Sequence, residues 1–237
     1  MMIQTENVLR TATLSMTNPT STFPVANIVH PFMIKLAKGT IDISTISALW
    51  SGDQSMNSLF IGYHNLYSVT IRLYNSASAL LATISKTSLE LYDVVYFTET
   101  YTTVRSMEID IVSSSEASLG SVSVGEAWKL PNMIAGYTTE HPDTSTVEQS
   151  TKGQVTQYKG QRLRAFPIAL NNISTAERKI FFDTYDFVLK GYPFWIDQYE
   201  DILSSEYPPM YCYFTEDPTE IRHQDMFSVT TAVKEAK

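Results

Sequence analysis

The clearest pattern of hydrophobic and polar positions lies in the segment Ser58–Tyr74. Residues Leu59–Ile61 are apolar on both faces of a strand, which is typical of a strand in the middle of a core. After a polar break, Val69, Ile71 and Leu73 alternate with more polar residues, and this period of two indicates a strand with one buried face. The segment therefore predicts two strands of a β-sandwich, joined by a short polar elbow.

Short strand patterns recur along the first half of the chain, with no long helical pattern between them. They cover residues 40–50, 79–84, 89–97, 104–112 and 119–124. The fold class predicted is mainly β: an antiparallel jelly-roll β-sandwich of about eight strands, followed by a small α+β domain with one main helix. The expected boundaries are an N-terminal arm at 1–24, the sandwich at 25–128, a linker or long loop at 129–153 and a docking domain at 154–237.

The main helix is predicted in the C-terminal third. Ser174 and Glu177 form a capping box, in which Ser174 accepts from a free N–H of the first turn and Glu177 reaches back. Gly191 and Pro193 end the helix, which is expected to run to about Lys190. Mostly apolar residues follow the cap at helical spacing: Ile180, Phe181, Thr184, Tyr185 and Val188.

Composition limits the possible partners. The 237 residues have a net charge of −8 and no run of Lys or Arg, so nucleic-acid binding is not expected. No window approaches the ~18 consecutive apolar residues that span a bilayer, so no membrane segment is expected. The N-terminus is polar and lacks the apolar core of a signal peptide, which predicts synthesis in a reducing cytosol.

The common catalytic motifs are missing. The sequence contains no GxGxxG, GxxxxGK[ST], GxSxG, HExxH or CxxC pattern, so neither a cofactor nor an enzymatic activity is expected. The single cysteine, Cys212, lies in a strand-like run, where a buried, inert thiol is the usual interpretation. A nucleophilic role would need a histidine partner, and His223 is the nearest in sequence.

Three groups of polar residues carry alternative interpretations. His64-Asn65 is either a polar site at a sheet edge or, as we favour, an elbow with Asn65 in the left-handed conformation. Glu140, His141 and Asp143 offer metal ligands, but an exposed polar loop is favoured and no metal site is predicted. Acidic residues of the C-terminal third could supply the two carboxylates of a glycosidase, but this interpretation is not favoured. The residues are Asp183, Asp186, Asp197, Glu200 and Asp201.

An aromatic group in the C-terminal third is the candidate interface. Aromatic side chains bury a large area at low entropic cost, so exposed members would form a binding patch and buried members a core. The candidate residues are Phe194, Trp195, Tyr207, Tyr211 and Tyr213.

Several segments together resemble a known family. The resemblance is to the galactose-binding-like (discoidin-type) jelly roll that serves as a structural module in tailed-phage virion proteins. The sandwich segments that carry it are Phe60–Leu66 (FIGYHNL), Ser68–Tyr74, Val104–Ile111 and Leu119–Gly125. The C-terminal third is similar to the companion part of these proteins at Lys159–Arg164, Gly191–Ile196 and Phe214–Pro218. No loop has the acidic spacing of a calcium site, so the lectin activity of the wider superfamily is not carried over.

The resemblance implies a structural component of a bacteriophage virion, in the tail or baseplate, that acts by protein–protein assembly. Such a protein would be made in the host cytoplasm and end in the virion. Its expected partners are other tail proteins and further copies of itself in a symmetric ring. The alternative is a carbohydrate-binding module that recognises host-surface glycans, and a third hypothesis is a glycan-cleaving enzyme.

Overall fold

The computed structural model describes residues 2–30, 35–130, 146–149, 155–158, 163–188, 193–197 and 208–236. The chain divides into two compact units. Unit 1 consists of Met1–Lys129, Tyr192–Tyr211 and Lys237, and unit 2 of Leu130–Gly191 and Cys212–Ala236. Tyr192–Tyr211 thus groups with unit 1, although the sequence placed it in the C-terminal domain.

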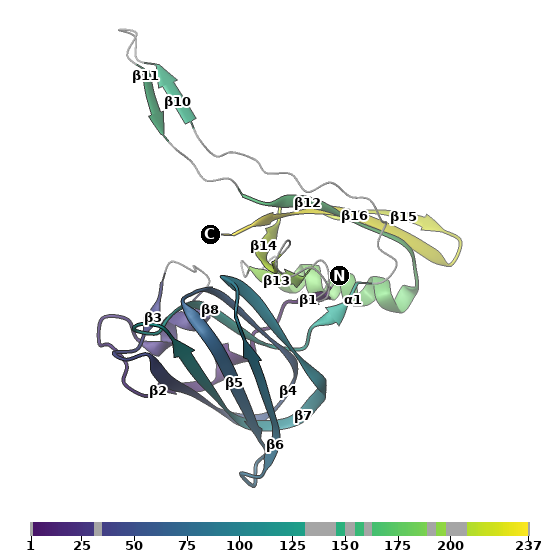
Figure 1. The fold of residues 1–237 in the computed structure, drawn as a ribbon. Helices are drawn as coiled ribbons and strands as arrows, with labels where there is room; N and C mark the ends of the chain where they lie inside the picture. The colour runs from purple at the N-terminus through teal and green to yellow at the C-terminus, as the bar shows by residue number, and fades with distance from the viewer. Residues whose placement is uncertain are drawn as a thin grey trace. The chain divides into compact units, whose positions relative to one another are not determined.

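An antiparallel sheet forms the body of unit 1 (Figure 1). Its strand order is β3-β8-β4-β7-β5-β6, and β2 pairs with β4 at the side. The strands are β2 Thr13–Met16, β3 Ala37–Lys38, β4 Ile43–His64, β5 Leu66–Tyr74, β6 Leu80–Thr87, β7 Tyr92–Ser113 and β8 Ser118–Gly125.

Each of the long strands β4 and β7 contributes one half to each layer of a sandwich. Their mutual pairing shifts register between Leu49 and Ser58. Before the shift, β4 pairs with β2 and the second half of β7, and after it β4 pairs with β8 and the first half of β7. Both strands bend visibly in Figure 1. Arg105 stabilises the bend, because its guanidinium donates to Asp53 Oδ1 at 3.0 Å and to the Ser51 carbonyl at 2.6 Å.

The alternation predicted for Ser58–Tyr74 is confirmed. Val69, Ile71 and Leu73 are buried, and the residues between them are partly exposed. Leu59–Ile61 is buried throughout, because side chains on one face enter the core of the sandwich and Phe60, on the other, stacks on Trp195 at 5.5 Å between centroids. Each such burial contributes about 1.5–3 kcal/mol.

The first residues of the chain do not form the predicted arm. Strand β1 (Met2–Gln4) pairs with β13 (Phe194–Asp197) and with β9 (Trp128–Lys129). The 3-10 helix η1 (Val8–Thr11) buries two apolar side chains, and the Trp50 indole donates to the Val8 carbonyl at 2.7 Å. A second 3-10 helix, η2 (Val25–Val29), follows β2. The polar composition of this segment hid its strand pairing, which depends on partners far away in the sequence.

Unit 2 contains a small antiparallel sheet and a helix. Strand β16 (Met226–Glu235) pairs with β12 (Ala165–Ile173) along one edge. Along the other edge it pairs with β15 (Thr219–His223) and with the end of β14 (Met210–Phe214). A separate hairpin is formed by β10 (Thr146–Gln149) and β11 (Val155–Tyr158). The helix α1 (Thr175–Val188) packs Tyr185 against Phe214 of β14, with ring centroids 5.1 Å apart.

The capping box of α1 is confirmed. The Ser174 backbone N–H donates to Glu177 Oε2 at 2.7 Å, and the Glu177 N–H donates to Ser174 Oγ at 3.3 Å. Hydrogen bonding to the backbone and side chain of Ser174 lowers the pKa of the Glu177 carboxyl. Of the predicted helical stripe, Ile180 is exposed and the other members are buried.

The fold-class prediction is confirmed. The chain is mainly β, with an antiparallel sandwich of the jelly-roll class followed by a smaller unit that combines strands with α1, the one α-helix of the described residues. No helix in the described parts of the chain is long and apolar enough to cross a membrane.

Candidate binding site

Most of the predicted interface aromatics lie in the protein interior. Phe194, Trp195 and Tyr211 are 1%, 1% and 4% exposed, so their assignment to a binding patch is wrong. Tyr213 is 40% exposed and remains available, whereas Tyr207 lies outside the described residues.

The burial of Trp195 follows from the pairing of β13 with β1. Its ring contacts the rings of Phe60, Tyr92 and Tyr211, the last at 5.1 Å between centroids. A Cβ placed on Gly62 would lie 2.5 Å from Trp195 Cη2, so only glycine leaves space for the indole. These aromatics therefore form a core beneath β4.

The residues considered for catalysis are not brought together. Asp197 is buried, and its Oδ2 accepts from the Tyr96 hydroxyl at 2.7 Å. Asp183 and Asp186 lie on the exposed face of α1, where Asp183 pairs with Lys179. The other two carboxylates, Glu200 and Asp201, lie outside the described residues. The described candidates thus lie in different units, Asp197 in unit 1 and Asp183 and Asp186 on α1 of unit 2, and do not support the glycosidase pair considered from the sequence.

The described residues do not support a metal site or a reactive cysteine. Glu140, His141 and Asp143 lie outside the described residues, and no group of three or more potential ligands occurs within them. Cys212 is completely buried, and burial raises the pKa of its thiol well above the usual value. The thiol therefore stays protonated and unreactive.

The elbow at His64-Asn65 is structural. His64 Nδ1 accepts from the Leu66 N–H at 3.0 Å, and burial lowers the pKa of this imidazole to about 4. The Asn65 amide holds the turn between β7 and β8, donating to the Glu116 carbonyl at 2.8 Å and accepting from the Ser118 N–H at 2.8 Å. The left-handed residue is Tyr63 (φ 57°), so its assignment to Asn65 is wrong.

A shallow hollow lies where β7 bulges away from β4. Met56 pairs with Tyr101 and Ser58 with Tyr96, so the segment Phe97–Thr100 lies opposite Asn57 alone. The hollow encloses about 370 Å³, a size within the range of small-ligand sites. Its lining residues are Met2, Asn57, Tyr96, Phe97, Glu99 and Thr100.

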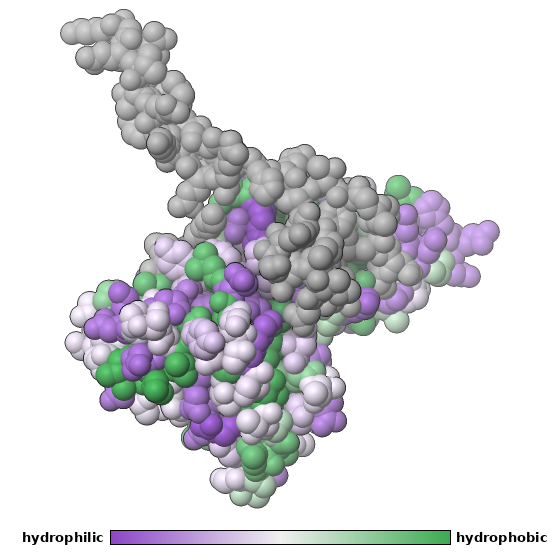
Figure 2. Space-filling model, in the orientation of Figure 1, coloured by the Kyte–Doolittle hydropathy of each residue, from purple (hydrophilic) through white to green (hydrophobic). Residues whose placement is uncertain are grey.

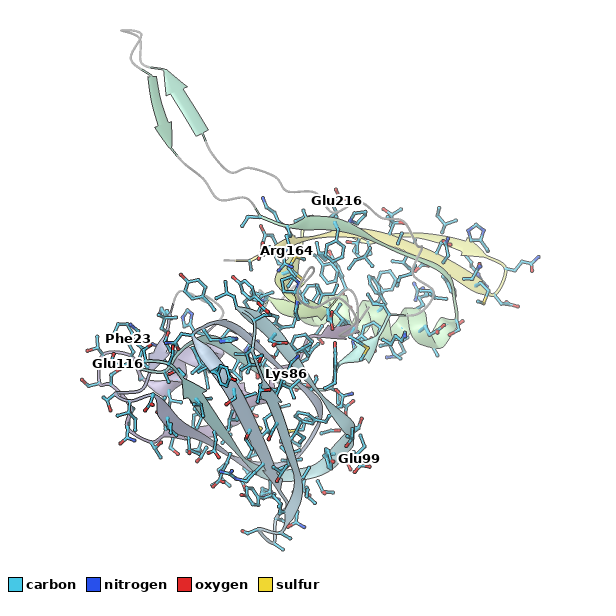
Figure 3. All side chains as sticks on the ribbon, viewed as in Figure 1. Phe23, Lys86, Glu99, Glu116, Arg164 and Glu216 are labelled. Carbon is cyan, nitrogen blue, oxygen red and sulfur yellow. The ribbon has the colours of Figure 1, made fainter. Side chains whose placement is uncertain are left out.

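Two polar side chains of the hollow are free for a ligand. Within the described residues, Glu99 and Thr100 make no hydrogen bond or ion pair through their side chains. By contrast, the Asn57 amide is fully engaged with Ala127, donating at 2.9 Å and accepting at 2.7 Å. Glu99 lies at the bend of the long strands in Figure 3. The hollow therefore combines a free carboxylate and hydroxyl with the aromatic residues Tyr96 and Phe97, of which Phe97 is 8% exposed.

Sequence reasoning missed this hollow because it treated 89–97 and 104–112 as separate strands. The available signal was the segment Phe97–Thr103, in which aromatic and Thr residues surround the single acid Glu99. Bulges of this kind are over-represented near functional sites.

Comparison with known proteins finds no matching family and no matching curated protein. Among solved structures, the lectin domain of lectinolysin in complex with Lewis B antigen is 16% identical, with a TM-score of 0.44 over 51% of this chain and 96% of that chain. Chitosan-binding module 1 from a chitosanase/glucanase of Paenibacillus sp. IK-5 is 15% identical, with a TM-score of 0.44 over 51% and 99%. A pectin-binding carbohydrate-binding module is 13% identical, with a TM-score of 0.42 over 54% and 96%. These similar structures are lectin or carbohydrate-binding modules, and each similarity covers about half of this chain.

Proposed function

We propose that unit 1 is a non-catalytic carbohydrate-binding module and that the hollow at the β7 bulge holds the saccharide. The observation that carries this proposal is the pairing of free polar groups, Glu99 and Thr100, with the aromatic residues Tyr96 and Phe97 in one concavity. A sugar ring presents an apolar C–H face and a rim of hydroxyls, so it needs an apolar surface beside hydrogen-bonding groups.

The charge of the hollow narrows the ligand class. Glu99 is the one charged residue in its lining, and the chain has a net charge of −8. An acidic glycan would place like charges together, whereas a carboxylate accepts well from sugar hydroxyls and from an ammonium group. The expected ligands are therefore neutral or basic saccharides.

We propose that the bound saccharide is not hydrolysed. Hydrolysis of a glycoside needs two carboxylates at a defined separation, and the lining supplies one, Glu99. Incubation of the protein with the bound oligosaccharide should leave it intact in chromatography. A released product would refute the non-catalytic assignment.

Glycan-array screening followed by calorimetry tests the binding. Glu99→Gln and Thr100→Val should each weaken binding about tenfold. The first replaces a charged acceptor by a neutral amide, and the second removes the hydroxyl. The matched control is Glu116→Gln, because Glu116 is also exposed and lies at a distant part of the sandwich in Figure 3. No binding to any neutral or basic glycan would overturn the proposal, as would binding that both hollow variants leave unchanged.

A second candidate function is assembly into a phage particle, in the tail or baseplate, with the virion as final location. The supporting observation is the number of exposed apolar side chains on unit 1: Ile41, Ile43, Leu49, Tyr63, Tyr67, Leu80 and Leu91. Mass spectrometry and immunogold labelling of purified particles test this candidate. Stoichiometric presence in the particle would support it, and consistent absence would refute it.

A further inference from the structure

Strand β6 leaves one edge of the sandwich open. In the described residues it pairs only with β5, so the backbone groups along its other edge have no strand partner. The strand is long for an edge, spanning Leu80–Thr87. Natural proteins shorten, charge or interrupt such edges, because an open edge is a template for pairing with another chain.

The other edges of the two main sheets carry these protections. The outer strands β2, β3 and β9 are only 4, 2 and 2 residues long. In unit 2, β12 contains Pro167, which has no N–H, and β15 carries Glu220, Arg222 and His223. The first half of β7 pairs with β4 alone in the described residues, but it carries the acids Asp93 and Glu99, and Lys86 Nζ donates to its Val94 carbonyl at 2.9 Å.

The open edge of β6 presents no charge. Its one charged residue, Lys86, is directed to the opposite layer, where Nζ pairs with Asp93 Oδ1 at 2.7 Å. The strand contains no proline. Thr83 and Ser85 are exposed, and Leu80 at its start is 55% exposed. Figure 2 shows apolar surface at the tip of the β5–β6 hairpin, at the bottom of the view.

We infer that β6 pairs antiparallel with β6 of a second copy of this chain, which extends the sheet across a two-fold axis. The strand is complementary to itself: registers centred on Thr83 or on Ile84 place Thr83 opposite Thr83 or Ser85, and Ile84 opposite Ala82 or Ile84. Neither register brings two charges face to face. A two-fold contact of this kind closes on itself and leaves neither β6 edge open.

Charge variants of the exposed face test the pairing. Thr83→Lys/Ser85→Lys and Thr83→Glu/Ser85→Glu place like charges across the axis, so each variant should be monomeric in light scattering and sedimentation. The wild-type chain should have twice the mass of one chain. Mixing the Lys and Glu variants should restore dimers, because opposite charges then face each other, and a partner other than a second copy predicts no such rescue.

The matched control is Thr13→Lys/Ser15→Lys on β2, the same pair of residue types at the other edge of this layer. This variant should remain dimeric. A wild-type chain that is monomeric at all concentrations would overturn the inference, and so would an oligomer that the Lys pair on β6 leaves intact. Glycan binding at the hollow should be unchanged in every variant, so failure of this inference is distinguishable from failure of the proposed function.

Discussion

The two units differ in the extent of their apolar cores. Unit 1 encloses an extended apolar core, from Leu9 of η1 to Val124 of β8, and a second aromatic group around Trp195. Unit 2 has a smaller sheet with its own buried side chains, such as Phe166 and Phe181. Both units carry ion pairs, such as Arg105–Asp53 in unit 1 and Arg164–Glu235 in unit 2. Apolar burial is insensitive to pH, whereas charged contacts depend on protonation. Substitutions at buried apolar positions should therefore act through lost packing, and those at ion pairs through lost polar contacts, in either unit.

The largest effect should come from Trp195→Ala. Removing a buried indole costs about 3–5 kcal/mol of unfolding free energy, because the rings of Phe60 and Tyr211 lose their partner. Denaturant unfolding followed by circular dichroism measures this loss. Trp195→Phe is the control and should cost much less, since it keeps an aromatic ring and removes an indole N–H that has no hydrogen-bond partner in the described residues. Equal costs would contradict a packing role.

Glu235→Ala should be the most damaging change in unit 2, at about 3 kcal/mol. Glu235 is 5% exposed and accepts from the Arg164 backbone N–H at 3.0 Å, so its loss leaves buried donors unpaired. Hydrogen exchange at β12 and β16 reports the effect locally. Asp183→Ala removes the exposed pair with Lys179 and should cost less than about 0.5 kcal/mol. A similar cost for both would remove the distinction between buried and exposed pairs.

One buried histidine, His64, should make the free energy of unfolding of unit 1 depend on pH in the acid range. The folded pKa of His64, about 4, lies below its unfolded value, because burial disfavours the imidazolium. Above pH 6.5 both states are neutral and stability is complete. As pH falls from 6.5 towards 4, only the unfolded state takes up the proton, and about 2–3 kcal/mol is lost. His64→Asn keeps an acceptor for the Leu66 N–H, so unfolding measured across this range should lose its dependence on this group.

A smaller effect than those of Trp195→Ala and Glu235→Ala should come from Ser174→Ala at the start of α1. It removes the acceptor for the Glu177 N–H and should cost about 1 kcal/mol. Ser174→Asn restores a capping oxygen and should recover most of that loss in the same unfolding experiment. A full loss in both variants would show that the hydroxyl acts elsewhere than at the cap.

Much of the fold was predictable because the signals are local. The capping box and stripe of α1, and the alternation in β5, follow from residues a few positions apart. The bend of β4 was not predictable, because Ser51–Asp53 resembles a loop until Arg105 pairs with it. The hollow was missed for the same reason, since Phe97–Thr100 bulges only relative to its pairing with β4.

The sequence by itself determined many of the strand segments, where the helix begins, and that the first half of the chain forms an antiparallel sandwich. Only the tertiary structure decided that Trp195 is core, that the first residues belong to the sheets of unit 1, and that β6 has an open edge. The physical reason is the range of the interactions. Periodicity and capping act between neighbours in the chain, whereas burial and strand pairing depend on residues brought together from distant positions.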